Sequence, residues 1–149
     1  MNTDIRADMA PLVPELLVTD FQRSYAFYTD VVGFSMLYGR PEDNFAYLNL
    51  DGAQIMLEQR EPGTERDWVA GPMEIPFGRG MNIQIAVADA ASVHARCVAA
   101  NADIFWPIED QWYRRDDMLL GVRQFIVKDP DGYLLRMAQD IGVRTLEAT

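Results

Sequence analysis

The sequence predicts an α+β protein built from two βαβββ units, each a mixed sheet with its helix on one side. Three observations lead to this prediction. The chain contains a weak internal repeat, each copy opens with a strand followed by an amphipathic helix, and each copy carries an Asp-Gly turn between two further strands.

The internal repeat is carried by order and spacing more than by identity. Residues 14–33 read PELLVTDFQRSYAFYTDVVG, and residues 83–102 read IQIAVADAASVHARCVAANA. Asp20 matches Asp89 at an offset of 69 residues, whereas Gly52 matches Gly132 at an offset of 80 residues. The second copy is therefore about eleven residues longer between its helix and its turn.

Each copy begins with a β-rich run, residues 12–18 and residues 83–87, followed by a helix. Asp20 and Asp89 stand at the expected N-caps, where a carboxylate accepts hydrogen bonds from exposed backbone N–H groups. Gly33 is a plausible helix stop. The apolar stripe of the first helix is formed by Phe21, Tyr25, Tyr28 and Val32.

Later in each copy, Asp51-Gly52 and Asp131-Gly132 predict hairpin turns. Residues 59–80 are rich in Pro and Gly and are expected to link the two copies, with Trp68 and Phe77 pinning the segment down. We expect one domain over residues 1–149, with module one at about 11–58, the linker at about 59–80, module two at about 81–140 and a tail at 141–149.

Composition limits the possible functions. Thirteen basic and twenty-three acidic residues give a net charge of −10, which argues against a nucleic-acid partner and favours neutral or cationic ligands, although acidity also simply aids solubility. The single Cys97 excludes an intramolecular disulfide and a thiolate metal cluster. Early charges at the N-terminus and the lack of a long apolar run predict a cytoplasmic protein with no membrane partner.

The openings LLVTDFQRSYAFYTDVVGF and the closing FIVKDPDGYLLRMAQ together resemble the vicinal oxygen chelate superfamily. This superfamily includes glyoxalase I, extradiol dioxygenases, fosfomycin-resistance enzymes and bleomycin-resistance proteins. The resemblance covers residues 12–139 and implies curved half-barrel sheets with helices on the outer face. It also implies a homodimer, with swapped and unswapped pairing both open.

Enzymes of the superfamily hold a divalent metal with one ligand from each of four strands, and the resemblance places Val13, Met56, Asn82 and Arg136 at those positions. Val13 has no donor atom, a thioether suits hard ions poorly, and Arg136 would repel a cation. The sequence therefore predicts no metal cofactor at the family's positions. A displaced site at Glu15 and Glu58, with Gln84, is the alternative.

Side chains alternate between the two faces of a strand, so the residues sort into an apolar face beneath the helices and a mixed polar face. Arg136 is expected on the polar face beside Glu15 and Glu58, either as a charge-paired group or as one that orients a ligand. The aromatic run IFWPIEDQWYRRDD, together with nearby carboxylates, suits a planar or cationic molecule. The residues expected to bind the ligand are Glu15, Tyr47, Gln54, Met56, Glu58, Asn82, Gln84, Trp106, Trp112, Tyr113 and Arg136.

The closest resemblance is to bleomycin-resistance proteins, through the empty metal positions, the acidic balance and the aromatics. It implies a homodimer without a cofactor that sequesters a small hydrophobic or cationic ligand, with a bleomycin-type antibiotic as one possibility. The alternative is an enzyme, either a lyase, isomerase or dioxygenase with displaced metal ligands, or one using Glu15 or Glu58 as a base. A structural or regulatory partner domain is the third hypothesis.

Overall fold

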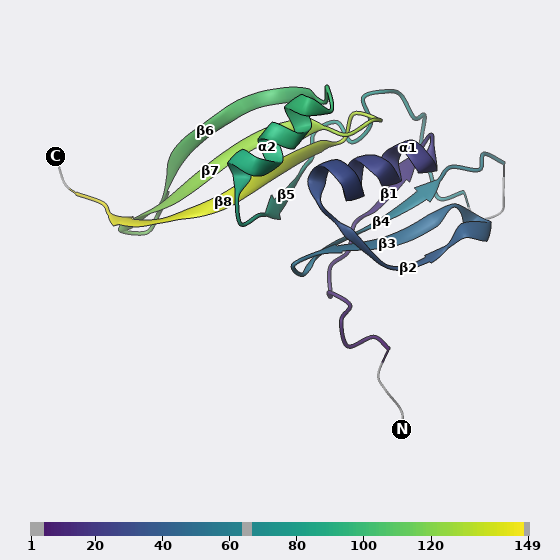
Figure 1. Cartoon of the computed structure of the whole chain (residues 1–149), viewed down its shortest axis with the longest axis horizontal. Helices are drawn as coiled ribbons and strands as arrows, with labels where there is room; N and C mark the ends of the chain where they lie inside the picture. Colours follow the sequence, from purple (N-terminus) through teal and green to yellow (C-terminus); the bar gives the residue numbers. More distant parts are fainter. Residues whose placement is uncertain (1–4, 64–66, 148–149) are drawn as a thin grey trace. The chain divides into compact units, whose positions relative to one another are not determined.

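The computed structural model describes residues 5–63 and 67–147. The chain forms two compact units, unit 1 at Met1–Met73 and unit 2 at Glu74–Thr149. Each unit contains one four-stranded mixed sheet that is not closed into a barrel, which confirms the predicted α+β class with two βαβββ modules (Figure 1). Whether the two units form one domain stays a prediction.

Unit 1 follows the predicted order of elements. Its strands are β1 (Glu15–Val18), β2 (Ser35–Arg40), β3 (Phe45–Leu50) and β4 (Ala53–Gln59), arranged β1-β4-β3-β2. Between β1 and β2 lie the helix α1 (Phe21–Ala26) and the π-helical segment η1 (Phe27–Val32), and a short 3-10 turn η2 (Pro41–Asp43) precedes β3. Asp20 caps α1 by accepting a hydrogen bond from the backbone N–H of Arg23, and Gly33 ends η1 with a φ of 109°.

One face of the unit 1 sheet is buried beneath α1 and η1 (Figure 1). Its strand residues share one parity and are almost fully buried: Leu16, Val18, Ala46, Leu48, Ile55 and Leu57. The helical segment contributes Phe21, Tyr28 and Val32 to the same core. The predicted stripe is thus confirmed at these three positions, while Tyr25 is only half-buried.

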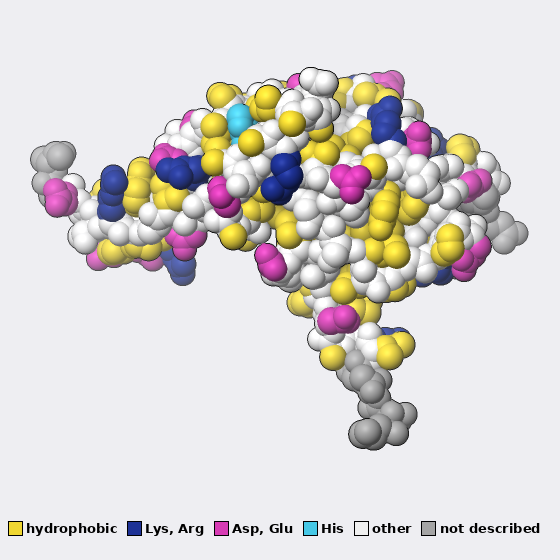
Figure 2. Space-filling model, in the orientation of Figure 1, with side chains coloured by type: hydrophobic (Ala, Val, Ile, Leu, Met, Phe, Trp, Pro, Cys, Tyr) yellow, Lys and Arg dark blue, Asp and Glu magenta, His cyan; other side chains and the backbone are white. Residues whose placement is uncertain are grey.

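Unit 2 repeats this plan with longer strands. Its strands are β5 (Asn82–Ala86), β6 (Asp103–Arg115), β7 (Met118–Lys128) and β8 (Leu134–Thr145), arranged β5-β8-β7-β6, with α2 (Ala90–Ala99) after β5. Beyond α2, β6, β7 and β8 continue as a three-stranded extension (Figure 1). The extra residues predicted for the second copy therefore lengthen a hairpin, along which basic, acidic and hydrophobic side chains are mixed (Figure 2).

The core of unit 2 lies between α2 and the face of the sheet formed by alternate residues. It is built from Ile85, Val93, Cys97, Phe125, Val127, Leu135 and Met137, all buried. The Asp-Pro-Asp-Gly turn is fixed by the buried Asp129, whose Oδ1 accepts hydrogen bonds from the backbone N–H groups of Asp131 and Tyr133, both at 2.9 Å. Gly132 has a φ of +96°, and a Cβ there would lie 2.5 Å from the side chain of Pro76, so only glycine fits.

Strand register reproduces the offsets of the sequence repeat. The parallel pair β1–β4 places Glu15 opposite Met56, and the parallel pair β5–β8 places Gln84 opposite Arg136. These partners differ by the same 69 and 80 residues as the matched caps and turns, which confirms the repeat alignment. Among the described residues, no helix is long and apolar enough to cross a membrane.

Candidate functional site

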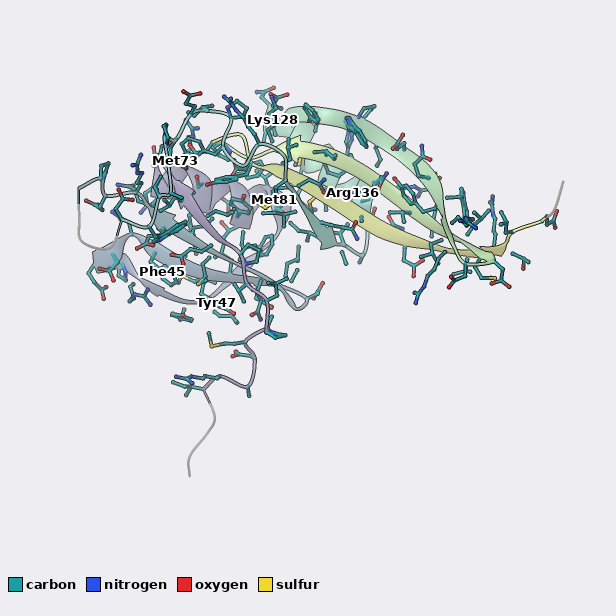
Figure 3. The ribbon with its side chains drawn as sticks, turned by 180° about the vertical axis from the view of Figure 1, so that it is seen from behind. Phe45, Tyr47, Met73, Met81, Lys128 and Arg136 are labelled. Atoms are coloured by element: carbon teal, nitrogen blue, oxygen red, sulfur yellow. The ribbon has the colours of Figure 1, made fainter. Side chains whose placement is uncertain are left out.

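The candidate site of unit 1 lies on the face of its sheet opposite α1, which we call the open face. Pairing between strands fixes which side chains meet there. Met56 on β4 lies between Glu15 on β1 and Tyr47 on β3, and one step along the strands Glu58 lies between Leu17 and Phe45. Figure 3 shows Phe45 and Tyr47 on this strand of unit 1.

A pocket of about 790 Å³ opens on this face. It is lined by Glu15, Leu17, Tyr38, Arg40, Glu42, Asp43, Phe45, Met56, Glu58, Gln59, Arg60, Glu61, Asp67 and Trp68. Its volume lies in the range that ligand pockets for small molecules occupy. Three of the predicted binding residues, Glu15, Met56 and Glu58, are thereby brought together in one pocket.

Carboxylates outnumber cations in this lining. The lining contains six acidic side chains and two arginines. Both arginines already have carboxylate partners: Arg40 Nε lies 3.1 Å from Asp43 Oδ2, and Arg60 Nη2 lies 3.5 Å from Asp67 Oδ2. The pocket is therefore electronegative, and it would attract a cationic group and repel an anionic one.

Aromatic rings form the other wall. Tyr38, on the edge strand β2, stacks on Tyr47 with ring centroids 5.1 Å apart and lies 5.9 Å from the ring of Phe45. The guanidinium of Arg40 covers one side of the Phe45 ring at 3.9 Å from its centroid. Trp68 is half-exposed at the rim. Aromatic faces beside carboxylates are the usual surroundings of a bound organic cation.

Tyr47 and Gln54, two further predicted residues, serve the fold rather than the pocket lining. Tyr47 is 1% exposed and Gln54 is 7% exposed, and the Tyr47 hydroxyl donates a hydrogen bond to Gln54 Oε1. The same oxygen accepts from the backbone N–H of Ala10, and Gln54 Nε2 donates to the carbonyl of Asp8, both at 2.6 Å. Burial raises the pKa of Tyr47, so it stays neutral in its role as donor.

In unit 2, Arg136 is held by neutral groups. Its Nε and Nη2 donate to Gln124 Oε1 at 2.8 and 2.6 Å, and Nη2 also donates to the hydroxyl of Tyr113 at 3.1 Å. Gln124 is 1% exposed, and its Nε2 donates to the Tyr113 hydroxyl and to Glu109 Oε1. Figure 3 labels Arg136 on β8. We call these four residues the Arg136 network.

The remaining predicted residues are distributed around unit 2. Asn82 and Gln84 are exposed on β5, with Gln84 directly opposite Arg136. Trp106 is 47% exposed rather than packed in the core. Trp112 neighbours Tyr113 in β6 and therefore points to the other face, where the guanidinium of Arg144 stacks on its ring at 3.7 Å. Arg136 and the carboxylates Glu15 and Glu58 belong to different units, so their predicted proximity stays a prediction.

The family's metal-ligand positions do not fit a divalent ion. Val13 lies outside β1, Met56 offers a thioether among carboxylate and aromatic neighbours, and Arg136 is a guanidinium fixed in the Arg136 network. Across residues 5–63 and 67–147, no three His, Cys, Asp or Glu side chains are arranged as a metal site. No step of a mechanism is therefore drawn through a metal.

Sequence reasoning missed several residues of both sites. Tyr38, Arg40 and Phe45 share a face with Glu58, which the alternation along β2 and β3 indicates only once the register is known. Trp68 was expected to pin the linker, and it also lines the pocket. Gln124 carried no sequence signal beyond being one polar residue in the apolar strand that precedes Asp129.

Two βαβββ units, each with one sheet face under a helix and an open face bearing polar or aromatic side chains, are the framework of a small-molecule-binding or metal-binding protein. The family model described as "Glyoxalase/Bleomycin resistance protein/Dioxygenase superfamily" matches residues 10–137, so the chain belongs to that superfamily.

Relatives and solved structures agree with this assignment. The chain is 25% identical over 142 residues to bleomycin resistance proteins of Geobacillus stearothermophilus and Staphylococcus aureus, covering 89% of this chain and 98% of each relative. Among solved structures, TioX from Micromonospora sp. ML1 is similar with a TM-score of 0.67 and 27% identity, over 89% of this chain and 99% of TioX. A protein of unknown function from Agrobacterium tumefaciens shares the fold with a TM-score of 0.66 and 23% identity.

Proposed function

We propose that this protein captures a small organic cation with an aromatic or planar part, and that the pocket of unit 1 holds it. The observation that carries the proposal is the combination in one pocket of excess carboxylates with the rings of Tyr38, Phe45 and Trp68. A cation gains from both, since the ring faces and the carboxylates carry the same sign of potential. Capture needs affinity alone and keeps the ligand from its target.

The relatives support the same direction. Proteins named for bleomycin resistance cover nearly the whole chain, so a bleomycin-type glycopeptide is the first ligand to test. We infer a homodimer acting without a metal or other cofactor, located in the cytoplasm, as the sequence predicts. Sedimentation equilibrium of the purified chain tests the dimer.

The deciding experiment is calorimetric titration of the full-length chain with copper-free bleomycin and a panel of smaller aromatic cations. Glu58→Gln should weaken binding by about tenfold or more, because one charge-assisted contact is lost. Asp30→Asn removes the same charge from the helical segment of unit 1, outside the pocket lining, and should leave the affinity within about twofold. Equal losses in both variants would show that general acidity, not this pocket, attracts the ligand.

The enzymatic alternative is tested in the same samples. Mass spectrometry of the ligand after prolonged incubation shows whether it is released unchanged, as the capture proposal requires. A product whose formation is lost in Glu58→Gln, while binding persists, would overturn capture and assign Glu58 as a base.

A further inference from the structure

We infer that the open face of unit 2 carries a second binding site, for a carboxylate group, centred on Arg136. This site is chemically opposite to the pocket of unit 1 and does not depend on the function proposed for it. The inference starts from how the guanidinium is held. Its two hydrogen-bonding partners, Gln124 Oε1 and the Tyr113 hydroxyl, are both uncharged.

A structural arginine is normally neutralised by a carboxylate, and unit 2 shows this arrangement on the other face of the same sheet. There Arg123 Nε lies 2.8 Å from Asp110 Oδ1 and Nη2 lies 3.0 Å from Oδ2. In the part of the chain that the structure describes, Arg136 has no carboxylate within ion-pair distance. Its orientation is therefore fixed while its charge remains unmatched.

The network also determines which edge of the guanidinium can reach a ligand. Gln124 occupies Nε and one hydrogen of Nη2, and Tyr113 occupies the other side of Nη2. Nη1 has no hydrogen-bond partner among the described residues, so two N–H donors are left. Gln84, directly opposite Arg136 on β5 and exposed, can add an amide donor beside them.

Gln124 explains why the cation stays in position without an anionic partner. It is almost fully buried, and both ends of its amide are used, the oxygen by Arg136 and the nitrogen by Tyr113 and Glu109. A guanidinium that is fixed before binding loses little side-chain entropy when a ligand arrives. Gln124 is thus a positioning residue for Arg136.

Glu109 sets the limit on the ligand's charge. Its carboxylate lies on the far side of Gln124, where it accepts hydrogen bonds from Gln124 and Gln111, both at 3.2 Å. Together with the chain's net charge of −10, it opposes anions, and it opposes a dianion about twice as strongly as a monoanion. The site therefore fits a single carboxylate better than a phosphate.

The test follows the Arg136 Nε–H signal in ¹⁵N NMR spectra of the full-length chain, because this proton is bonded to Gln124 and should exchange slowly. Sodium benzoate should shift the signal, and uncharged benzamide should leave it in place. Glu109→Gln keeps an acceptor for Gln124 but removes the opposing charge, so benzoate should bind several-fold more tightly. Inorganic phosphate should bind more weakly than benzoate.

Three variants complete the experiment, with benzoate affinity read from backbone amide shifts on β5 and β8. Arg136→Gln should weaken benzoate binding at least about tenfold, whereas Arg123→Gln, the matched control, should not change it. Glu58→Gln should leave benzoate binding intact even where it abolishes cation capture, which separates the two sites. Equal shifts with benzamide and benzoate, no gain in Glu109→Gln, or tighter binding of phosphate would each overturn the inference.

Discussion

At the scale of single residues, two buried glutamines organise the open faces of the two units. Gln54 ties a segment near the N-terminus to the unit 1 sheet, and Gln124 fixes the guanidinium of Arg136 in unit 2. Both use the donor and the acceptor end of the same amide, which suits a buried position because neither end is left unsatisfied.

Replacing Gln54 by methionine tests the first of these roles. Methionine keeps the length of the side chain but leaves the Tyr47 hydroxyl without its acceptor and releases Ala10 and Asp8. We expect unfolding free energy to fall by about 1–3 kcal/mol in urea titrations. Hydrogen exchange at the Ala10 amide should accelerate as well.

Gln22→Met is the matched control, since Gln22 is exposed on α1 and the same substitution there buries no polar group. An unchanged exchange rate at Ala10 in Gln54→Met would mean that the segment is held by other contacts. In that case the hydrogen bonds of Gln54 contribute little to its position.

At the scale of elements, the cap of α2 makes stability depend on pH. The Asp89 carboxylate accepts hydrogen bonds from the Ser92 hydroxyl at 2.8 Å and from its backbone N–H at 3.1 Å, and these bonds hold the pKa of Asp89 below its usual range. A lowered folded-state pKa stabilises the fold above the unfolded-state pKa, and this contribution is lost as the pH falls through the folded-state pKa.

Asp89→Asn isolates that effect, because asparagine caps helices about as well but does not titrate. The wild-type urea midpoint should exceed that of Asp89→Asn at pH 6, and the gap should close below about pH 4, near the ordinary pKa of aspartate. A gap that stays constant across this range would show that the difference arises from packing, not from the charge on Asp89.

The extension of β6, β7 and β8 depends on a glycine that leaves room for Trp112. A Cβ at Gly121 would lie 2.7 Å from the Trp112 ring and 2.8 Å from Ile141, closer than real contacts allow. We therefore expect Gly121→Ala to lower the unfolding free energy by about 1–3 kcal/mol and to alter tryptophan fluorescence. Gly71→Ala, where nothing lies within 4 Å of a new Cβ, is the control. Equal stability of the two variants would mean that the ring can move away without cost.

Elements were more predictable from the sequence than sites, for a physical reason. Caps such as Asp20 and Asp89, the stop at Gly33 and the Asp-Gly turns act within a few residues, so local sequence specifies them. The open faces depend on which residues meet across strands. Tyr38 stands opposite Tyr47 only after a register shift in β2, and Gln124 reaches Tyr113 from 11 residues away, and nothing local signals either contact.

The aromatic run of residues 104–117 shows the same limit. The sequence groups Trp106, Trp112 and Tyr113 as neighbours, but successive residues in a strand point to opposite faces. Tyr113 joins the Arg136 network, whereas Trp112 packs against Gly121 and Arg144 on the other face. Composition near a site is therefore a weaker guide than parity along the strand.

At the scale of the whole molecule, the net charge of −10 should govern how a ligand arrives. An acidic protein attracts a cation over a distance set by the Debye length, which shrinks from about 30 Å at 0.01 M salt to about 8 Å at 0.15 M. The pocket of unit 1 adds a local excess of carboxylates at the end of that path. Long-range attraction mainly raises the association rate, while the contacts in the pocket set the dissociation rate.

Stopped-flow fluorescence of Trp68 against an aromatic cation and its uncharged analogue separates these contributions. Between 0.01 and 0.15 M salt, the association rate of the cation should fall by about tenfold, and that of the uncharged analogue should barely change. Glu58→Gln should mainly speed dissociation of the cation, because it removes a contact while the overall charge changes only slightly. Equal salt dependence for both ligands would mean that the rings, not the carboxylates, select what enters the pocket.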